Sequence, residues 1–96
     1  MFDVSTAIFT YDPAKDDENF RKHGLRLQDF AQFDTLVALV ADTRGNYGER
    51  RFRIFGRIAE KAYMIVVTER DEAVRLISFR RGHEKEMRRY EQRTDR

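Results

Sequence analysis

The stretch RFRIFGRIAEKAYMIVVT, residues 51–68, determines the expected fold because charged and apolar residues alternate cleanly along its first half. Phe52, Ile54 and Ile58 face one way, whereas the arginines at 51, 53 and 57 face the other, as in a strand with one buried side. The tripeptide AEK is short enough for a tight turn, and AYMIVVT follows as a second strand. The stretch therefore predicts an antiparallel hairpin.

Similar patterns on both sides extend this hairpin into a sheet. LVALVA, residues 36–41, predicts a buried strand, and VRLISFR, residues 74–80, predicts another. In the latter, two sets of side chains are expected on opposite faces: Arg75, Ile77 and Phe79 on one, and Leu76, Ser78 and Arg80 on the other. Short turns make the last four strands an antiparallel meander. AIFTY, residues 7–11, adds a short strand at the N-terminal end.

Three segments have helical patterns. Asp12-Pro13 is a strong helix start, and Gly24 ends a helix expected over 13–23. A second helix is expected over 27–33 and a last one over 82–93. The order β-α-α-β-β-β-β-α predicts one α+β domain, residues 1–96, in which the N-terminal strand and two helices pack on an antiparallel sheet that is followed by a C-terminal helix.

Composition limits the class of protein. Of the 96 residues, 38% are charged, above the usual fraction of about 25%. Residues 1–42 carry 4 Lys/Arg against 8 Asp/Glu, and residues 43–96 carry 15 against 9. The net charges of the two parts are therefore −4 and +6. Either one face is prepared for a polyanion, or ion pairs between the halves cancel the charge. The absence of cysteine, of a signal peptide pattern and of any long apolar run predicts a cytoplasmic protein without a membrane span.

Few chemistries fit these residues. The five glycines are scattered and form no phosphate-binding loop, and two distant histidines predict no metal site. What remains is a row of arginines on the strand 51–58. This row is a solvated sheet face, or it is covered by an anion such as the RNA backbone or by an acidic protein. Phe55 shares the arginine face and is suited either to base stacking or to packing against the last helix.

His23 has two interpretations. It stands before Gly24, where a cation complements the dipole at a helix end, so a structural role is expected from local sequence alone. A histidine also titrates near neutral pH, so it is a candidate for acid–base chemistry too, although local sequence alone favours the structural role.

Four segments resemble the BrnT family, the toxins of BrnT/BrnA type II toxin–antitoxin systems: FTYDPAKDDENFRKHG, GERRF with the following FG, VVTERDEAVRLISFRR and EMRRYE. The resemblance covers about residues 9–90. Its most specific positions are Asp12-Pro13, Lys15, Asn19, Lys22-His23-Gly24, Glu49-x-Arg51, Thr68-x-Arg70 and Ile77-Ser78-x-Arg80. The chain departs from the family at Tyr11, where Trp is more usual, at Phe79, where Ala is usual, and at Thr35, where Pro often follows Asp34.

The resemblance implies a RelE-like fold and a ribonuclease that halts translation. It also implies a BrnA-like antitoxin with a ribbon-helix-helix DNA-binding part, whose complex with the toxin represses their operon. No cofactor is implied, and the isolated toxin is a candidate homodimer. The alternative is a non-catalytic module that binds an acidic antitoxin or nucleic acid through its basic sheet face.

Cleavage of RNA without a metal requires a base for the 2′-hydroxyl, cations for the phosphorane and a proton for the leaving oxygen. His23 or Glu49 suits the first task, arginines the second, and Tyr90 or an arginine-assisted water the third. The candidate catalytic residues are His23, Glu49, Arg51, Arg70 and Arg80. The candidate RNA-binding residues are Lys22, Arg53, Arg57, Arg81 and Tyr90.

Strand register favours one end of the sheet as the chemical centre. A tight turn over 59–61 would place Arg51 opposite Glu69 and Arg57 opposite Tyr63. Arg70 would then share the Arg51 end, with Arg80 roughly 20 Å away unless a bulge changes the register.

Overall fold

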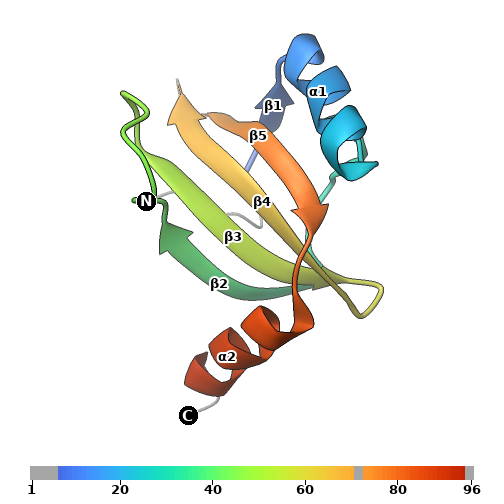
Figure 1. Ribbon diagram of the computed structural model, residues 1–96, viewed down its shortest axis with the longest axis vertical. Coiled ribbons are helices and arrows are strands. Elements are labelled where there is room, and N and C mark those ends of the chain that lie inside the picture. Colours follow the sequence, from blue (N-terminus) through green and yellow to red (C-terminus); the bar gives the residue numbers. More distant parts are fainter. Residues whose placement is uncertain (1–6, 71–72, 95–96) are drawn as a thin grey trace.

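The computed structural model describes residues 7–70 and 73–94, which form one five-stranded sheet with two α-helices (Figure 1). The strands run in the spatial order β1-β5-β4-β3-β2. The elements along the chain are β1 (Phe9–Tyr11), α1 (Pro13–His23), a 3₁₀ turn η1 (Leu27–Asp29), β2 (Thr35–Ala41), β3 (Arg51–Ile58), β4 (Lys61–Arg70), β5 (Ala73–Arg81) and α2 (Glu84–Thr94). The α+β class is confirmed.

The sheet is mixed, so the expectation of a purely antiparallel sheet was wrong. Strands β2 to β5 form the predicted antiparallel meander, but β1 pairs with β5 in parallel, with Phe9 opposite Val74. The reason is topological, because β1 is separated from β5 by most of the chain and is not constrained by a hairpin turn.

The β3–β4 hairpin has a turn of two residues. Ala59 and Glu60 both have positive φ, 51° and 68°, the conformation that matches the twist of the flanking strands. Arg51 therefore lies opposite Thr68, and Arg57 opposite Ala62. The expected partners Glu69 and Tyr63 were one residue out, because a turn that included Lys61 was one residue too long.

A β-bulge in β5 overturns the alternation expected there. The register shifts between Val66, which faces Ser78, and Val67, which faces Leu76, so Ile77 is the extra residue. Leu76 and Phe79 both enter the same core, although they are three positions apart. Arg75 and Arg80, which were expected on opposite faces, consequently share one face.

Helix α1 has the predicted ends. The Asp12 carboxylate accepts a hydrogen bond from the Ala14 N–H at 2.9 Å, and Gly24, at φ 72°, donates its N–H to the Phe20 carbonyl at 2.8 Å. The second helix, expected over 27–33, is only the 3₁₀ turn Leu27–Asp29. The chain becomes extended at Phe30, whose ring is buried in edge contacts with the rings of Phe9, Phe33 and Phe79.

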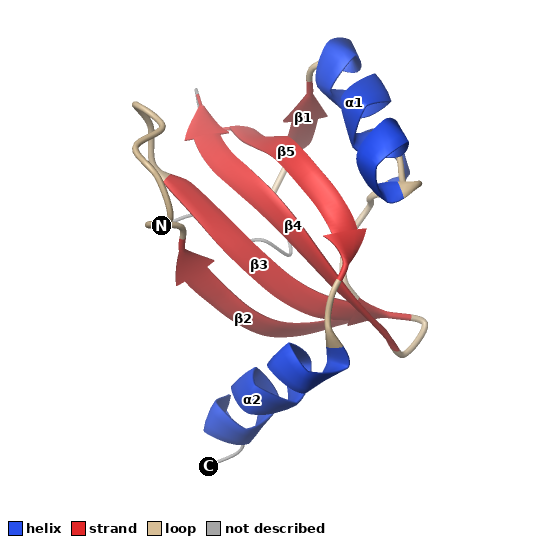
Figure 2. Cartoon of the chain, viewed as in Figure 1, coloured by secondary structure: helices blue, strands red, loops and turns tan. Residues whose placement is uncertain are grey.

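The two faces of the sheet have separate cores. One face is covered mainly by the segment 25–33 and not by two helices, since Leu27 and Phe30 pack there against β3, β4 and β5. The other face carries α2, whose Met87 is fully buried and whose Tyr90 ring lies 4.8 Å from that of Phe55. Figure 2 shows α1 beside β5 and α2 near β2.

Strand β2 is less buried than predicted. It is the last strand of the sheet and therefore has a neighbour on one side only. Of its seven residues Val37 is buried, and Leu36 is 53% exposed. The continuous apolar run reflects an edge strand and not a central one.

Candidate active site

Two adjoining pockets lie where α1 meets the α2 face of the sheet. Their volumes are about 220 and 210 Å³, and both are lined by His23 of α1, Arg51 of β3, and Ile77 and Ser78 of β5. Further cations line one pocket or the other, Lys15 and Lys22 the first, and Arg44 and Arg80 the second, with the acids Glu18 and Asp42 among them. Residues from three elements far apart in sequence thus form one cationic hollow.

The bulge in β5 places Arg80 in this hollow. Because the bulged residue Ile77 and its neighbour Ser78 both line the pockets, the alternation of β5 side chains is interrupted between Leu76 and Phe79, and Arg80 lies on the same face as Ile77 and Ser78. The Arg80 guanidinium donates to the Arg81 carbonyl at 2.8 Å and approaches the Met64 sulfur at 3.4 Å. Within residues 7–70 and 73–94 no carboxylate lies in ion-pair distance of it, so its charge is available to an anion.

Arg51 is held in place from two sides. Its Nε lies 3.0 Å from Oε2 of Glu49, and its guanidinium lies 4.1 Å from the centre of the Tyr47 ring. The side chain is 25% exposed. The loop between β2 and β3 therefore orients this arginine at the pocket and keeps a carboxylate beside it.

His23 is in an environment that favours the neutral imidazole. The residue is exposed, but what burial it has lowers its pKa below the ordinary value of 6.5, and the nearby charges of Arg80 and Lys22 lower it further. A neutral imidazole at neutral pH can accept a proton, as a general base must.

Helix α1 presents a polar stripe to the pockets. Lys15, Glu18, Asn19, Lys22 and His23 follow the helical spacing i, i+3, i+4, i+7, i+8. Within the stripe Lys22 pairs with Glu18 at 2.9 Å. Sequence reasoning selected only Lys22 and His23 here, although the repeat of polar residues at this spacing is visible in the sequence. It also missed the pocket residues Asp42, Arg44, Tyr47 and Ser78 as site residues.

Asp42 and Arg44 form a separate ion pair at the second pocket. The Arg44 side chain donates to Asp42 at 2.8 and 2.9 Å, and its backbone N–H donates at 3.2 Å. These hydrogen bonds outweigh burial and lower the pKa of Asp42 to about 2. The positive charge of Arg53 also lowers the pKa of Asp42. The pocket rim therefore keeps an ionised aspartate at every ordinary pH.

Arg70 shares the Arg51 end of the sheet, as predicted, because it lies two residues beyond Thr68, the partner of Arg51, but it is far from Arg80. It is at the end of β4 opposite Ala73, whereas Arg80 is opposite Met64, six residues earlier on β4. At 3.3 Å per residue this separation is roughly 20 Å. Arg70 does not line either pocket, whereas Glu49 reaches the site through Arg51.

The predicted RNA-binding residues have mixed surroundings. Arg57 forms ion pairs with Glu84 and Glu91 of α2, so it fastens that helix. Tyr90 packs on Phe55, and Arg53 lies 5.7 Å from the centre of the same ring. Arg81 lies over the Tyr63 ring at 5.1 Å and donates to the Ala62 carbonyl at 3.2 Å. Of this set only Lys22 lines either of the two pockets, and it lines the first.

The described residues contain neither a metal-binding cluster nor a membrane-spanning helix. No group of three or more His, Cys, Asp or Glu side chains is placed to hold a metal ion. No helix in this part of the chain is long and apolar enough to cross a membrane.

Comparison with known proteins identifies a family. The family model described as "Ribonuclease toxin, BrnT, of type II toxin-antitoxin system" matches residues 11–86. This range contains all the residues that line the two pockets. Searches of curated proteins and of solved structures found no match.

Proposed function

The chain belongs to the BrnT family of ribonuclease toxins of type II toxin–antitoxin systems, and from this premise we propose that it cleaves RNA without a metal ion at the pockets that contain His23, Arg51 and Arg80. The observation that carries the proposal is the convergence of a proton acceptor and two guanidinium groups from α1, β3 and β5. The RelE-like fold belongs to the same proposal.

The chemistry assigns one task to each group. His23 removes the proton of a ribose 2′-hydroxyl, and the resulting oxygen attacks the adjacent phosphorus while the bond from phosphorus to the 5′-oxygen breaks. Arg51 and Arg80 stabilise the charge on the phosphorane, because a guanidinium stays charged and its fork matches two phosphate oxygens. A water assisted by an arginine protonates the departing 5′-oxygen, and the proton that His23 has taken returns to the resulting hydroxide. Glu49 keeps Arg51 oriented.

The first prediction tests this assignment by RNA cleavage in the presence of a chelator. His23→Ala and Arg80→Ala are each expected to reduce kcat about 10²-fold or more, because each removes a group that acts on the transition state. Arg21→Ala is the matched control, since Arg21 is an exposed cation on α1 that lines neither pocket. Arg70→Ala tests whether the catalytic centre lies instead at the Arg70 end of the sheet.

The outcomes of that experiment locate the catalytic centre, test the metal-free mechanism and test the non-catalytic alternative. Full cleavage by Arg80→Ala together with loss in Arg70→Ala would move the catalytic centre to the Arg70 end. Cleavage that disappears on chelation and returns with a divalent cation would refute the metal-free mechanism. RNA binding without cleavage by the parent protein would favour the non-catalytic module.

The proposal extends to partners and cellular effect. A BrnA-like antitoxin with a ribbon-helix-helix part would cover the basic sheet face and bind operator DNA in the complex. Free toxin would act in the cytoplasm and inhibit translation by destroying RNA. Growth arrest on expression that requires His23 and Arg80, and that coexpression of the antitoxin prevents, is the expected result in cells.

A further inference from the structure

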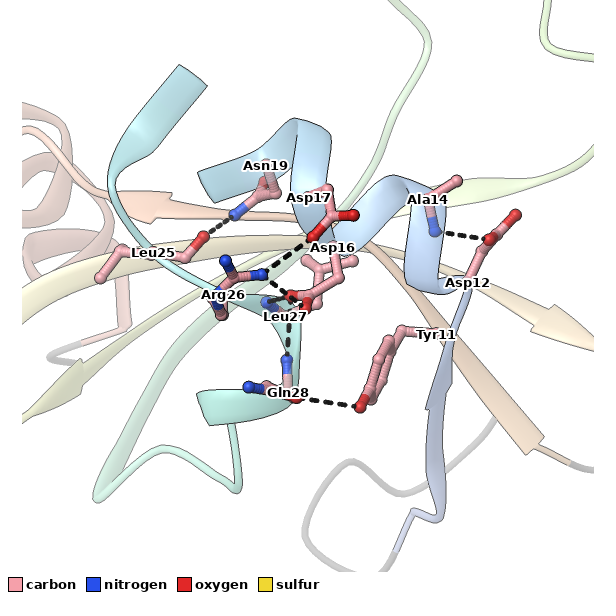
Figure 3. A network of polar contacts seen from close by, with 10 residues as sticks. All are labelled: Tyr11, Asp12, Ala14, Asp16, Asp17, Asn19, Leu25, Arg26, Leu27 and Gln28. Carbon is pink, nitrogen blue, oxygen red and sulfur yellow. Dashed lines mark hydrogen bonds and ion pairs between the residues drawn. The ribbon is translucent and has the colours of Figure 1, made fainter. Parts of the chain in front are cut away.

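Asn19 is a buried residue of α1 whose side chain makes three hydrogen bonds. It is 4% exposed, and its carboxamide nitrogen donates to the carbonyls of Phe79 and Leu25, both at 2.8 Å. Its carboxamide oxygen accepts from the N–H of Phe79 at 3.0 Å. Figure 3 shows the amide group of Asn19 directed at the Leu25 carbonyl. One side chain therefore satisfies both backbone groups of a single strand residue.

This contact continues the edge of β5 where β1 stops. Strand β1 pairs with Val74, Arg75 and Leu76 only, so Phe79 lies beyond its reach. A buried backbone N–H or C=O without a partner is costly, and the carboxamide supplies the donor and acceptor that a neighbouring strand would have supplied. The Asn19–Phe79 pair is thus a substitute for one rung of the sheet.

The position of α1 depends on polar contacts of this kind. The buried residues of α1 are Asp16 and Asn19, and its one large apolar side chain, Phe20, is 46% exposed. Asp16 binds the loop after the helix, because it accepts from the N–H of Leu27 at 2.6 Å and from the Arg26 guanidinium at 3.2 Å (Figure 3). Asn19 is the residue that binds the sheet.

The hydrogen bonds of Asn19 join the two elements that carry His23 and Arg80, the groups that the proposed reaction uses. Asn19 precedes His23 by one helical turn on the same stripe of α1. Phe79 is adjacent to Arg80. A displacement of α1 along or away from β5 would therefore change the separation of the His23 imidazole from the Arg80 guanidinium.

We propose that Asn19 is a positioning residue, which fixes α1 against β5 so that His23 and Arg80 act on the same phosphate. The inference rests on the proposed function of the pockets. It adds a residue that does not touch the reacting atoms and that sets the geometry of the two that do. An error of about 1 Å in such geometry is enough to cost 10²-fold in rate.

The test compares Asn19→Ala with Asp16→Ala. Both truncate a buried polar residue of α1, but Asp16 does not line the pockets and contacts no residue of β5 in the hydrogen bonds above. The titration of the His23 imidazole is measured by NMR on folded protein, and kcat for RNA cleavage is measured over pH. The charged groups around His23 are Lys15, Glu18 and Lys22 of α1, Asp42, Arg44 and Arg51 of the β2–β3 region, and Arg80 of β5.

We expect Asn19→Ala to raise the pKa of His23 toward 6.5 and to lower kcat tenfold or more, with a smaller change in KM. Asp16→Ala should not raise that pKa, although it should lower stability as well. An unchanged His23 titration and an unchanged kcat in folded Asn19→Ala would overturn the proposal. If Asn19→Ala does not fold, Asn19→Ser is measured in its place with the same two outcomes.

Failure of this inference differs from failure of the proposed function. The NMR titration reports the position of α1 whether or not RNA is cleaved. If cleavage by the parent is unaffected by His23→Ala, the proposed function fails. If His23→Ala abolishes cleavage while folded Asn19→Ala titrates and cleaves like the parent, only the positioning role fails.

Discussion

At the scale of single residues, the division of labour at the end of α1 decides what His23 can do. Gly24 ends the helix by its left-handed backbone and its hydrogen bond to Phe20, so the imidazole is not needed as a cap. The imidazole instead lies among cations that disfavour its own protonation. Local sequence suggested the cap and the family motif suggested the chemistry. The motif around His23 is visible in the sequence, whereas the proximity of Arg80 depends on tertiary structure.

The lowered pKa of His23 predicts how stability depends on pH. Below about pH 6.5 the unfolded chain protonates this imidazole more readily than the folded protein does, so the free energy of unfolding falls as pH drops through the folded pKa. His23→Gln should remove this contribution. Urea unfolding at pH 7.5 and pH 5 measures it. Equal losses of stability in the parent and in His23→Gln would show that the folded state does not disfavour the charged imidazole.

At the scale of elements, β5 shows which features could be predicted and which could not. Its apolar core residues Val74, Leu76 and Phe79 are spaced by two and then by three, which is the signature of an inserted residue. Ile77 obscures that signature because it is apolar too and fits a regular alternation. The strand was therefore predictable, and the bulge that places Arg80 in the same pocket as Arg51 was not. A similar limit applied at the hairpin, where the strands were predicted and the turn length was not.

Arg57 attaches α2 to the sheet through ion pairs. Its guanidinium binds Glu91 at 2.9 and 3.0 Å and Glu84 at 3.1 Å, and these bonds raise its own pKa and lower those of both glutamates. Arg57→Met should speed hydrogen exchange of the α2 amides a few-fold, because partly exposed ion pairs contribute modestly.

The exchange experiment has a control and a pH dependence. Arg89→Met, on the exposed side of the same helix, should leave exchange unchanged. The difference in α2 exchange rate between Arg57→Met and the parent should be present above about pH 4.5. It should vanish as the pH falls through the lowered pKa values of Glu84 and Glu91, because protonated glutamates no longer pair with Arg57. A difference that persists in strong acid would mean that Arg57 holds α2 by packing alone.

At the scale of the whole molecule, the charge asymmetry of the sequence survives folding. The ion pairs seen in the described residues join near neighbours or connect β3 to α2, and only Asp42–Arg44 links the acidic first 42 residues to the basic remainder. The acids of α1 are used on the helix itself and on Arg26. Cancellation between the halves therefore does not neutralise the arginines of the sheet. The fold leaves Arg51, Arg53 and Arg80 on the face that α2 covers only in part.

The arginines on this face are expected to bind the antitoxin. Arg53 lies on the same side of β3 as Arg51, so an acidic partner that covers the pockets would meet both, and association would weaken with salt. Arg53→Glu should weaken binding of the separately purified antitoxin tenfold or more in low salt, whereas Arg89→Glu on α2 should bind like the parent. Arg57 is a poor probe because its substitution would also disturb α2. If Arg53→Glu binds as tightly as the parent, the antitoxin must occupy another surface, and RNA should still enter the pockets of the complex.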